Sequence, residues 1–155
     1  MKTVFRSLML AVVLATLSIG TVRAGSEVPA GYYADQRVVY HNGGGGPDGP
    51  AYFKRLLGNL RNHVEAVGKA HVEIRVVSLG DGVALFQSAA SDEELAGRID
   101  ALKAMGVRFL VCANTLRERK IDRAALHGVS EDDVVPSGVA ELARLQGLGF
   151  VYIHP

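Results

Sequence analysis

The amino-acid sequence predicts a single α/β domain built on a mainly parallel sheet of four or five strands. Short apolar runs alternate with segments of helical periodicity, and glycine-rich turns separate them. The 155-residue chain is 48% hydrophobic and 21% charged, which is the composition of a globular protein. Strands that alternate with helices are typical of a doubly wound sandwich, in which right-handed crossovers place helices on both faces of the sheet.

The first 24 residues have the pattern of a secretory signal peptide. Lys2 and Arg6 precede an apolar run from Leu8 to Ile19, and Val22-Arg23-Ala24 supplies a small-x-Ala cleavage pattern. The alternative is an uncleaved membrane anchor, but the apolar run is shorter than the ~20 residues that a spanning helix needs. We therefore expect a periplasmic or secreted protein with no membrane association after cleavage. The predicted division of the chain is a signal peptide, a flexible lead-in and an α/β domain: residues 1–24, 25–35 and 36–155.

The charge balance argues against a nucleic-acid partner. Residues 1–24 contain three basic residues and no acidic one, so the rest of the chain has 14 basic and 16 acidic residues. The basic residues between Arg117 and Arg123 are interleaved with Glu118 and Asp122, as on a solvated helix face. Nucleic-acid binders usually carry a basic stripe with aromatic residues, so we expect no nucleic-acid partner.

Two strands and an intervening helix are predicted for the first half of the domain. Arg37-Val38-Val39-Tyr40 is a short β run, and a breaker-rich loop follows it at residues 41–50. Asp48 can cap the next helix, which Gly68 ends. The second strand is the nearly continuous apolar run from Val72 to Val77. The apolar residues of the helix recur at steps of three and four: Tyr52, Phe53, Leu56, Leu57, Leu60, Val64 and Val67.

A second helix is predicted after the turn at residues 80–82 and an apolar segment from Val83 to Phe86. Ser91 and Glu94 can form its capping box, and Gly106 can end it. Its expected buried residues are Leu95, Ile99 and Leu102.

The third strand, Val107–Val111, leads to Cys112 and to a helix that Asn114 or Thr115 can cap. A polar stretch follows, and then a short strand at Val134-Val135. Ser137 begins the last helix, and Phe150–Ile153 forms the last strand. The expected buried face of that helix is Val139, Leu142 and Leu145.

Cys112 is the single cysteine, so it cannot form an internal disulfide. It lies at a strand-to-helix turn, and ligands of open parallel sheets bind at the carboxyl ends of the strands. A helix amino terminus there stabilises a thiolate and lowers the pKa of the thiol. Cysteine also packs as a small, buried hydrophobic residue. Both interpretations, a reactive thiol and a buried inert one, are open from the sequence alone.

Two further segments are expected at the same edge of the sheet: His41-Asn42 with the glycine run, and Pro136-Ser137. The glycine run has neither the P-loop nor the dinucleotide fingerprint. It is either a loop whose free amides receive a small anion or a plain flexible connection. His41 can serve as an acid, a base or a hydrogen-bond donor near Cys112, or it can bond only its own loop.

Metal, cofactor and serine-hydrolase chemistry are not predicted. The five histidines lack ligand spacing, and a lone thiol does not make a zinc site. No Gly-x-Ser-x-Gly turn is present, and a role as a helix cap explains Ser137.

Two separated segments and the chain end carry a recognisable pattern. The first is Phe109–Leu116, which contains Cys112-Ala113-Asn114-Thr115, and the second is Val134–Gln146, followed by Gly149–Pro155. In these segments the chain resembles the DsrE/DsrF-like family of small sulfur-relay proteins. The resemblance extends from about Arg37 to the end and includes His41-Asn42. It is greatest to the exported, single-domain, poorly characterised branch of the family.

The resemblance implies a three-layer, flavodoxin-like fold and assembly into homo-oligomers. In active members it also implies a cysteine that carries sulfane sulfur as a persulfide, with sulfur donors and acceptors as partners. Cys112 matches the cysteine of this branch, with Asn114 and Thr115 beside it. Fold follows from such a resemblance more directly than reaction does.

The leading hypothesis is a sulfur carrier or sulfurtransferase in which the Cys112 thiolate attacks a sulfur donor and holds a persulfide. The alternative is a non-catalytic module that binds a small anion or mediates assembly and has a buried, inert cysteine. The residues expected to contact the substrate are His41, Asn42, Asn114, Thr115 and Ser137.

Overall fold

Five parallel strands form the central sheet of the computed structural model, in the order β4-β3-β2-β1-β5. The structure describes residues 29 and 31–155, so the predicted signal peptide lies outside the described residues. The predicted α/β fold with a parallel sheet is confirmed. The strands are β1 (Gln36–Asn42), β2 (Val72–Ser78), β3 (Arg108–Cys112), β4 (Val134–Val135) and β5 (Val151–Ile153).

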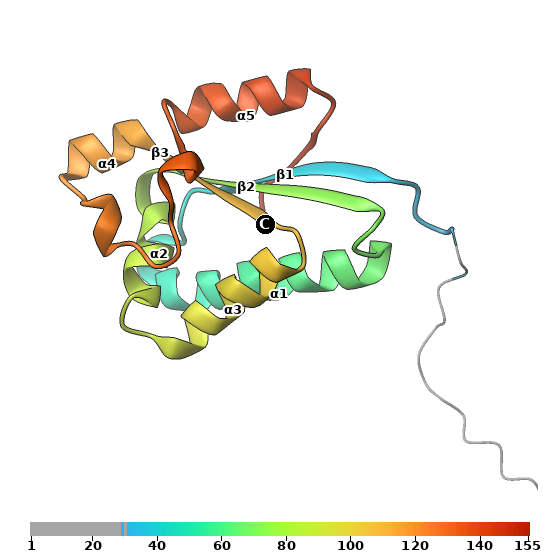
Figure 1. Ribbon diagram of the computed structural model, residues 1–155, viewed down its shortest axis with the longest axis horizontal. Helices are drawn as coiled ribbons and strands as arrows, with labels where there is room; N and C mark the ends of the chain where they lie inside the picture. The colour runs from blue at the N-terminus through green and yellow to red at the C-terminus, as the bar shows by residue number, and fades with distance from the viewer. Residues whose placement is uncertain (1–28, 30) are drawn as a thin grey trace, which may run out of the picture.

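Helices lie on both faces of the sheet, as right-handed crossovers require (Figure 1). On one face lie α1 (Gly49–Val67), α2 (Ala84–Ala89) and α3 (Glu93–Ala104). On the other lies α5 (Gly138–Gly147), which contacts β1, β2, β3 and β5. The short helix α4 (Ala113–Arg119) continues directly from β3. The result is a three-layer, flavodoxin-like sandwich.

The larger apolar core lies between the sheet and α1, α2 and α3. The helix α1 forms because its apolar residues recur on one side, and that side is buried. Phe86 of α2 meets Phe109 of β3 edge to face, with ring centroids 5.9 Å apart. Fully buried members of this core include Leu56, Leu57, Leu60, Ile74, Val76, Leu85, Phe86 and Ile99.

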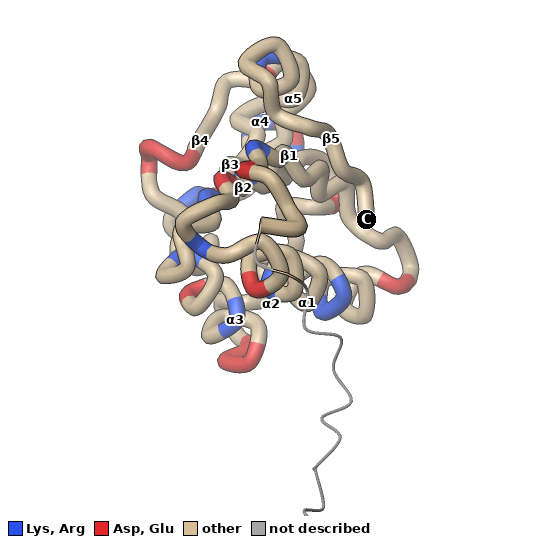
Figure 2. The backbone as a smooth tube through the Cα atoms, turned by 90° about the vertical axis from the view of Figure 1, so that its right-hand side faces the viewer, with Lys and Arg blue, Asp and Glu red and all other residues tan. Residues whose placement is uncertain are grey.

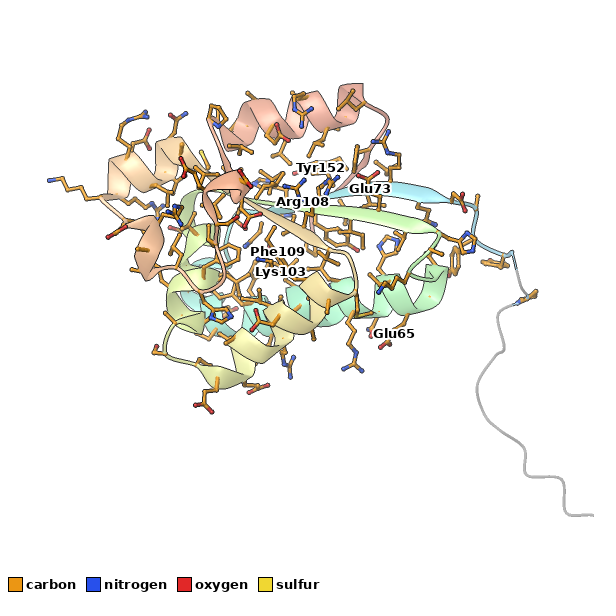
Figure 3. The ribbon with its side chains drawn as sticks, in the orientation of Figure 1. Glu65, Glu73, Lys103, Arg108, Phe109 and Tyr152 are labelled. Atoms are coloured by element: carbon orange, nitrogen blue, oxygen red, sulfur yellow. The ribbon has the colours of Figure 1, made fainter. Side chains whose placement is uncertain are left out.

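The smaller apolar core lies under α5. Alternate residues of each strand point to opposite faces of a sheet, so Arg108 lies toward the α5 side while Phe109 lies in the larger core (Figure 3). By the same alternation Leu110 and Cys112 belong to the α5 side. The buried residues of this smaller core are Val39, Val77, Leu110, Leu142, Leu145 and Phe150.

Three details of the predicted elements are wrong. Asp92, and not Ser91, is the N-cap of α3, and its carboxylate accepts from the Leu95 amide at 3.1 Å. Cys112 itself is the N-cap of α4, two residues before Asn114 and three before Thr115, the two caps expected from the sequence. Val139 is 67% exposed, because it lies on the exposed side of α5, away from the buried residues Leu142 and Leu145.

Charged residues of both signs are scattered over the chain (Figure 2). Arg119 of α4, for example, pairs with Asp81 at 2.7 Å. Such interleaving agrees with the mixed surface expected from the sequence. Among the described residues, none of the helices combines the length and the apolar character needed to cross a membrane.

Candidate functional site around Cys112

Cys112 occupies the junction of three elements at the carboxyl edge of the sheet. It is the last residue of β3, it is the N-cap of α4, and its backbone is extended (φ −74°, ψ 116°). The first residue of α5, Gly138, lies directly against it, since a Cβ built on Gly138 would be 3.1 Å from the Cys112 Cβ. The amino termini of two helices therefore converge on this side chain.

The backbone amides at that convergence set the acidity of the thiol. Burial raises the pKa of Cys112, but hydrogen bonds oppose it, first from the Gly138 amide, then from the amide and hydroxyl of Thr115, and then from the Asn114 amide. The net result is a pKa below the ordinary thiol value. This balance matters because the thiolate, and not the thiol, is the nucleophilic form.

The Cys112 side chain is nearly buried. It is only 5% exposed, and Gly138, which packs on Leu79, lies against it. The surroundings of the sulfur formed by Asn114, Thr115 and Gly138 are called the Cys112 pocket. A pocket lined only by aliphatic side chains would favour the neutral thiol, because desolvation penalises the charged form. Here polar donors face the sulfur, so burial and acidification occur together.

Thr115 is the side chain that links the pocket to the neighbouring strand. It is 6% exposed, and its hydroxyl oxygen accepts a hydrogen bond from the Gly80 amide at 3.0 Å. Because the oxygen is engaged as an acceptor, the hydroxyl proton is free to donate to the Cys112 sulfur. The loop after β2 thus fixes the orientation of a donor that belongs to α4.

Gly138 is a functional position that sequence reasoning missed. Its amide gives the largest stabilisation of the Cys112 thiolate, and a Cβ there would lie 3.0 Å from Leu79 and 3.1 Å from Cys112. The available signal was its place immediately after the predicted helix cap, Ser137, where the first amides of a helix lack partners. That signal does not reveal which group the amide approaches.

Ser137 and Asn114 act mainly through the backbone. The Ser137 hydroxyl caps α5 by accepting from the Ala140 amide at 3.4 Å, which confirms its predicted role as a cap. The Asn114 side-chain oxygen accepts from Arg117 at 2.8 Å, while its amide contributes to the thiolate. Direct contact of either side chain with a substrate stays a prediction.

Asn42 is fully buried and its side chain joins two loops. Its amide group donates to the Ser78 hydroxyl at 3.0 Å and to the Gly82 carbonyl at 2.9 Å, and its oxygen accepts from the Gly44 amide at 3.2 Å. All of these partners lie within the protein, so Asn42 holds the carboxyl ends of β1 and β2 together.

His41 lies on the same face of the sheet as Cys112 but is not beside it. It is in register with Val77, which is in register with Leu110. Two strand spacings, about 10 Å, therefore separate β1 from β3 at this level. The His41 side chain instead bonds the Tyr152 hydroxyl at 2.8 Å. The structure brings Thr115, Gly138 and Asn114 to the thiol and leaves His41 in a separate cluster.

Among residues 29 and 31–155, no group of three or more His, Cys, Asp or Glu side chains is arranged to hold a metal ion. The Cys112 pocket itself offers amides and one hydroxyl, which bind an anionic sulfur rather than a cation. This arrangement and the fold define a class: a three-layer α/β protein with a buried, acidified thiol at the carboxyl edge of its sheet.

Comparisons with known proteins identify the family within that class. A family model described as the DsrE/DsrF-like family matches residues 53–155, about two thirds of the chain. A solved structure of a protein of unknown function, MTH1491 from Methanobacterium thermoautotrophicum, is 36% identical. The match covers 78% of this chain and 100% of the MTH1491 chain, with a TM-score of 0.65. No curated protein matches the sequence.

The chain therefore belongs to the DsrE/DsrF-like family, which is associated with sulfur relay. The matched segment contains Cys112, Thr115 and Gly138, so the thiol pocket lies inside the family region. His41 and the glycine loop precede it.

Proposed function

We propose that Cys112 receives a sulfane sulfur atom, holds it as a persulfide and passes it to an acceptor. The observation that supports this proposal is the lowered pKa of a buried thiol that faces hydrogen-bond donors. A purely structural cysteine needs no such donors, because the neutral thiol packs as a small hydrophobic group. The association of the family with sulfur relay points the same way.

The transfer needs no external oxidant or reductant. The Cys112 thiolate attacks the outer sulfur of a donor R–S–S⁻, the donor S–S bond breaks, and R–S⁻ leaves with the bonding electron pair. A new S–S bond joins that sulfur to Cys112. An acceptor thiolate then attacks the outer sulfur, and the Cys112 thiolate is released. The donors from Gly138 and Thr115 stabilise the anion at the start and end of the cycle.

The experiment compares wild type with Cys112→Ser after incubation with polysulfide or thiosulfate. Intact-mass measurement should show one added sulfur atom on wild type and none on the variant, which keeps the size and the capping position of the side chain. Release of the added sulfur by a thiol acceptor should restore the original mass. No adduct on wild type, or an equal adduct on Cys112→Ser, would remove the proposal.

A second candidate function is a small-anion-binding or assembly module in which Cys112 is inert. The 5% exposure of Cys112 favours it, because a reagent must reach a nearly buried side chain. The discriminating measurement is the rate of alkylation of the native protein by a small and by a bulky thiol reagent. Reaction with neither reagent until the protein is denatured supports the inert module, whereas fast reaction with the small one supports the sulfur carrier.

Export and self-assembly complete the proposal. The predicted signal peptide supports cleavage after Ala24. Mass analysis of the amino terminus of the protein from its native host tests this cleavage.

Exposed apolar side chains on and beside α5 and β5 support a homo-oligomer, and sedimentation analysis measures its size. These side chains are Val139, Leu148, Val151 and Tyr152.

A further inference from the structure

A second cluster of chemically active side chains lies at the carboxyl ends of β1 and β5, away from Cys112. His41 Nδ1 and the Tyr152 hydroxyl are 2.8 Å apart, and the ring of His154 is centred 5.0 Å from that of His41. Residues paired in register share a face of a sheet, and Val39 pairs with Tyr152. The two strands therefore present His41, Tyr152 and His154 on the α5 side, where Figure 3 shows Tyr152.

Unsatisfied polar atoms mark this region. Among the buried side-chain nitrogen and oxygen atoms of the described residues, two have no hydrogen-bond partner: His41 Nε2 and the Tyr52 hydroxyl oxygen. The glycine loop after β1 contacts both residues: Gly43 lies against the Nε2 atom of His41, whereas Gly45 lies against the Cβ and Cγ atoms of Tyr52, which belongs to the larger core. Tyr52 is only 8% exposed, and Tyr152 is one of the groups that raise its pKa, after burial. Buried polar groups are normally paired, so the orphan Nε2 of His41 points to a missing ligand.

The space between the two imidazoles is defined by Gly43. A Cβ built on Gly43 would lie 3.3 Å from His41 Nε2 and 3.9 Å from His154 Nε2, so both nitrogens face one point beside the loop. His154 follows the last residue of β5 and is exposed, so its ring can turn toward that point. A side chain at position 43 would occupy part of this space.

The chemistry of the cluster favours a cation that binds neutral imidazole. A neutral ring whose Nδ1–H donates to the Tyr152 oxygen presents a lone pair at Nε2. The three side chains of the cluster offer imidazole and phenol groups rather than the carboxylates that hard cations such as Mg²⁺ or Ca²⁺ prefer. Imidazole suits Zn²⁺ and Cu²⁺.

We propose that His41 Nε2 and His154 Nε2 form a binding site for one borderline divalent transition-metal ion of the Zn²⁺ class. Tyr152 fixes the tautomer and orientation of His41, as outer partners of metal-bound histidines commonly do. Water completes the coordination shell. The site is independent of the sulfur chemistry, because Cys112 is two strands away.

The test measures Zn²⁺ binding to tag-free full chain carrying Cys112→Ser, which removes the thiol as a ligand. Competition with a chromophoric chelator should give one Zn²⁺ per chain. His41→Ala and His154→Ala should each weaken binding by at least about tenfold, and Tyr152→Phe should weaken it by a smaller factor. His71→Ala is the matched control, because His71 is exposed and bonds Asp35 elsewhere in the domain. It should leave binding unchanged.

Gly43→Ala supplies a test that removes no ligand. Its methyl group would fill the point that the two Nε2 atoms share, so Zn²⁺ affinity should fall while circular dichroism and the Tm stay near wild type. His154→Ala, at an exposed position beyond β5, keeps the test valid if His41→Ala fails to fold. Absence of stoichiometric binding overturns the proposal, as does equal binding by wild type and His154→Ala or an equal loss in His71→Ala.

Discussion

The two faces of the sheet differ in what covers them and in what they carry. On one face, α1, α2 and α3 bury a continuous apolar core that includes Leu60 and Phe86. On the other, α5 alone buries a smaller core, and charged side chains such as Glu73 and Arg108 line a groove beside it. Both the thiol and the histidine pair lie on the α5 side. The comparison indicates that the first face stabilises the fold while the second positions reactive groups.

Packing density explains why the reactive side chains lie on the face that α5 alone covers. Large apolar cores are close-packed and leave no room for polar donors or for a ligand. A face covered by one helix leaves its edges open, so helix amides and loop residues can approach the strand ends. Cys112 and His41 lie at the carboxyl ends of β3 and β1, on either side of β2. Stability and reactivity can then be changed separately, which the following variants test.

The largest expected effect separates the two cores. Leu60→Ala, at a fully buried position of the larger core, should reduce the free energy of unfolding by about 2–5 kcal/mol. Leu145→Ala, under α5, should cost less, because its smaller core is bounded by the open edges of the sheet and relaxes more completely. Denaturant titration measures both. An equal or larger loss in Leu145→Ala would contradict the division of roles.

Gly138→Ala should raise the pKa of Cys112 and, by overpacking, reduce the free energy of unfolding by about 1–3 kcal/mol. Its methyl group would press on Leu79 and Cys112 and move the amide that contributes most to the thiolate. The thiolate absorbance, followed against pH, reports the pKa, and alkylation at neutral pH should slow several-fold. Gly147→Ala, where a Cβ meets open space near the end of the same helix, is the matched control and should leave the pKa unchanged.

Thr115→Val should raise the pKa of Cys112 by a smaller amount. The substitution keeps the shape of the side chain but removes the hydroxyl donor, while the amides of Thr115 and Gly138 stay in place. It also leaves the Gly80 amide without its acceptor, so a modest loss of stability accompanies it. Thr115→Ser should retain most of the wild-type pKa. A pKa in Thr115→Val equal to that of wild type would show that the hydroxyl does not act on the sulfur.

The smallest expected effect is a pH dependence of stability. The pKa of Cys112 is lower in the folded chain than in the unfolded chain, so the folded chain releases its thiol proton at lower pH. The resulting stabilisation is fully present above the unfolded value and disappears as the pH falls through the folded value. Wild type should therefore gain stability relative to Cys112→Ser as the pH rises toward the ordinary thiol range. A constant difference across that range would mean that the fold does not favour the thiolate.

Much of the fold could be predicted from the sequence because local patterns carry it. The helical periodicity from Tyr52 to Val67 predicts α1, and the apolar run from Val72 to Val77 predicts β2. The segment Val83–Phe86 could not be assigned in this way, and it forms a 3-10 turn and the start of α2. Short apolar runs fit strands and helices equally well, and only packing against neighbouring elements decides between them.

For the candidate site, too, some features follow from neighbouring residues in the sequence and others depend on contacts between distant segments. The sequence by itself determined that Cys112 ends a strand and begins a helix, because both elements are contiguous with it. Only the tertiary structure decided that Gly138 supplies the leading donor, that Asn42 is buried between loops, and that His154 lies beside His41. These residues are far apart along the chain, and contacts between distant segments depend on how the whole sheet and its helices pack.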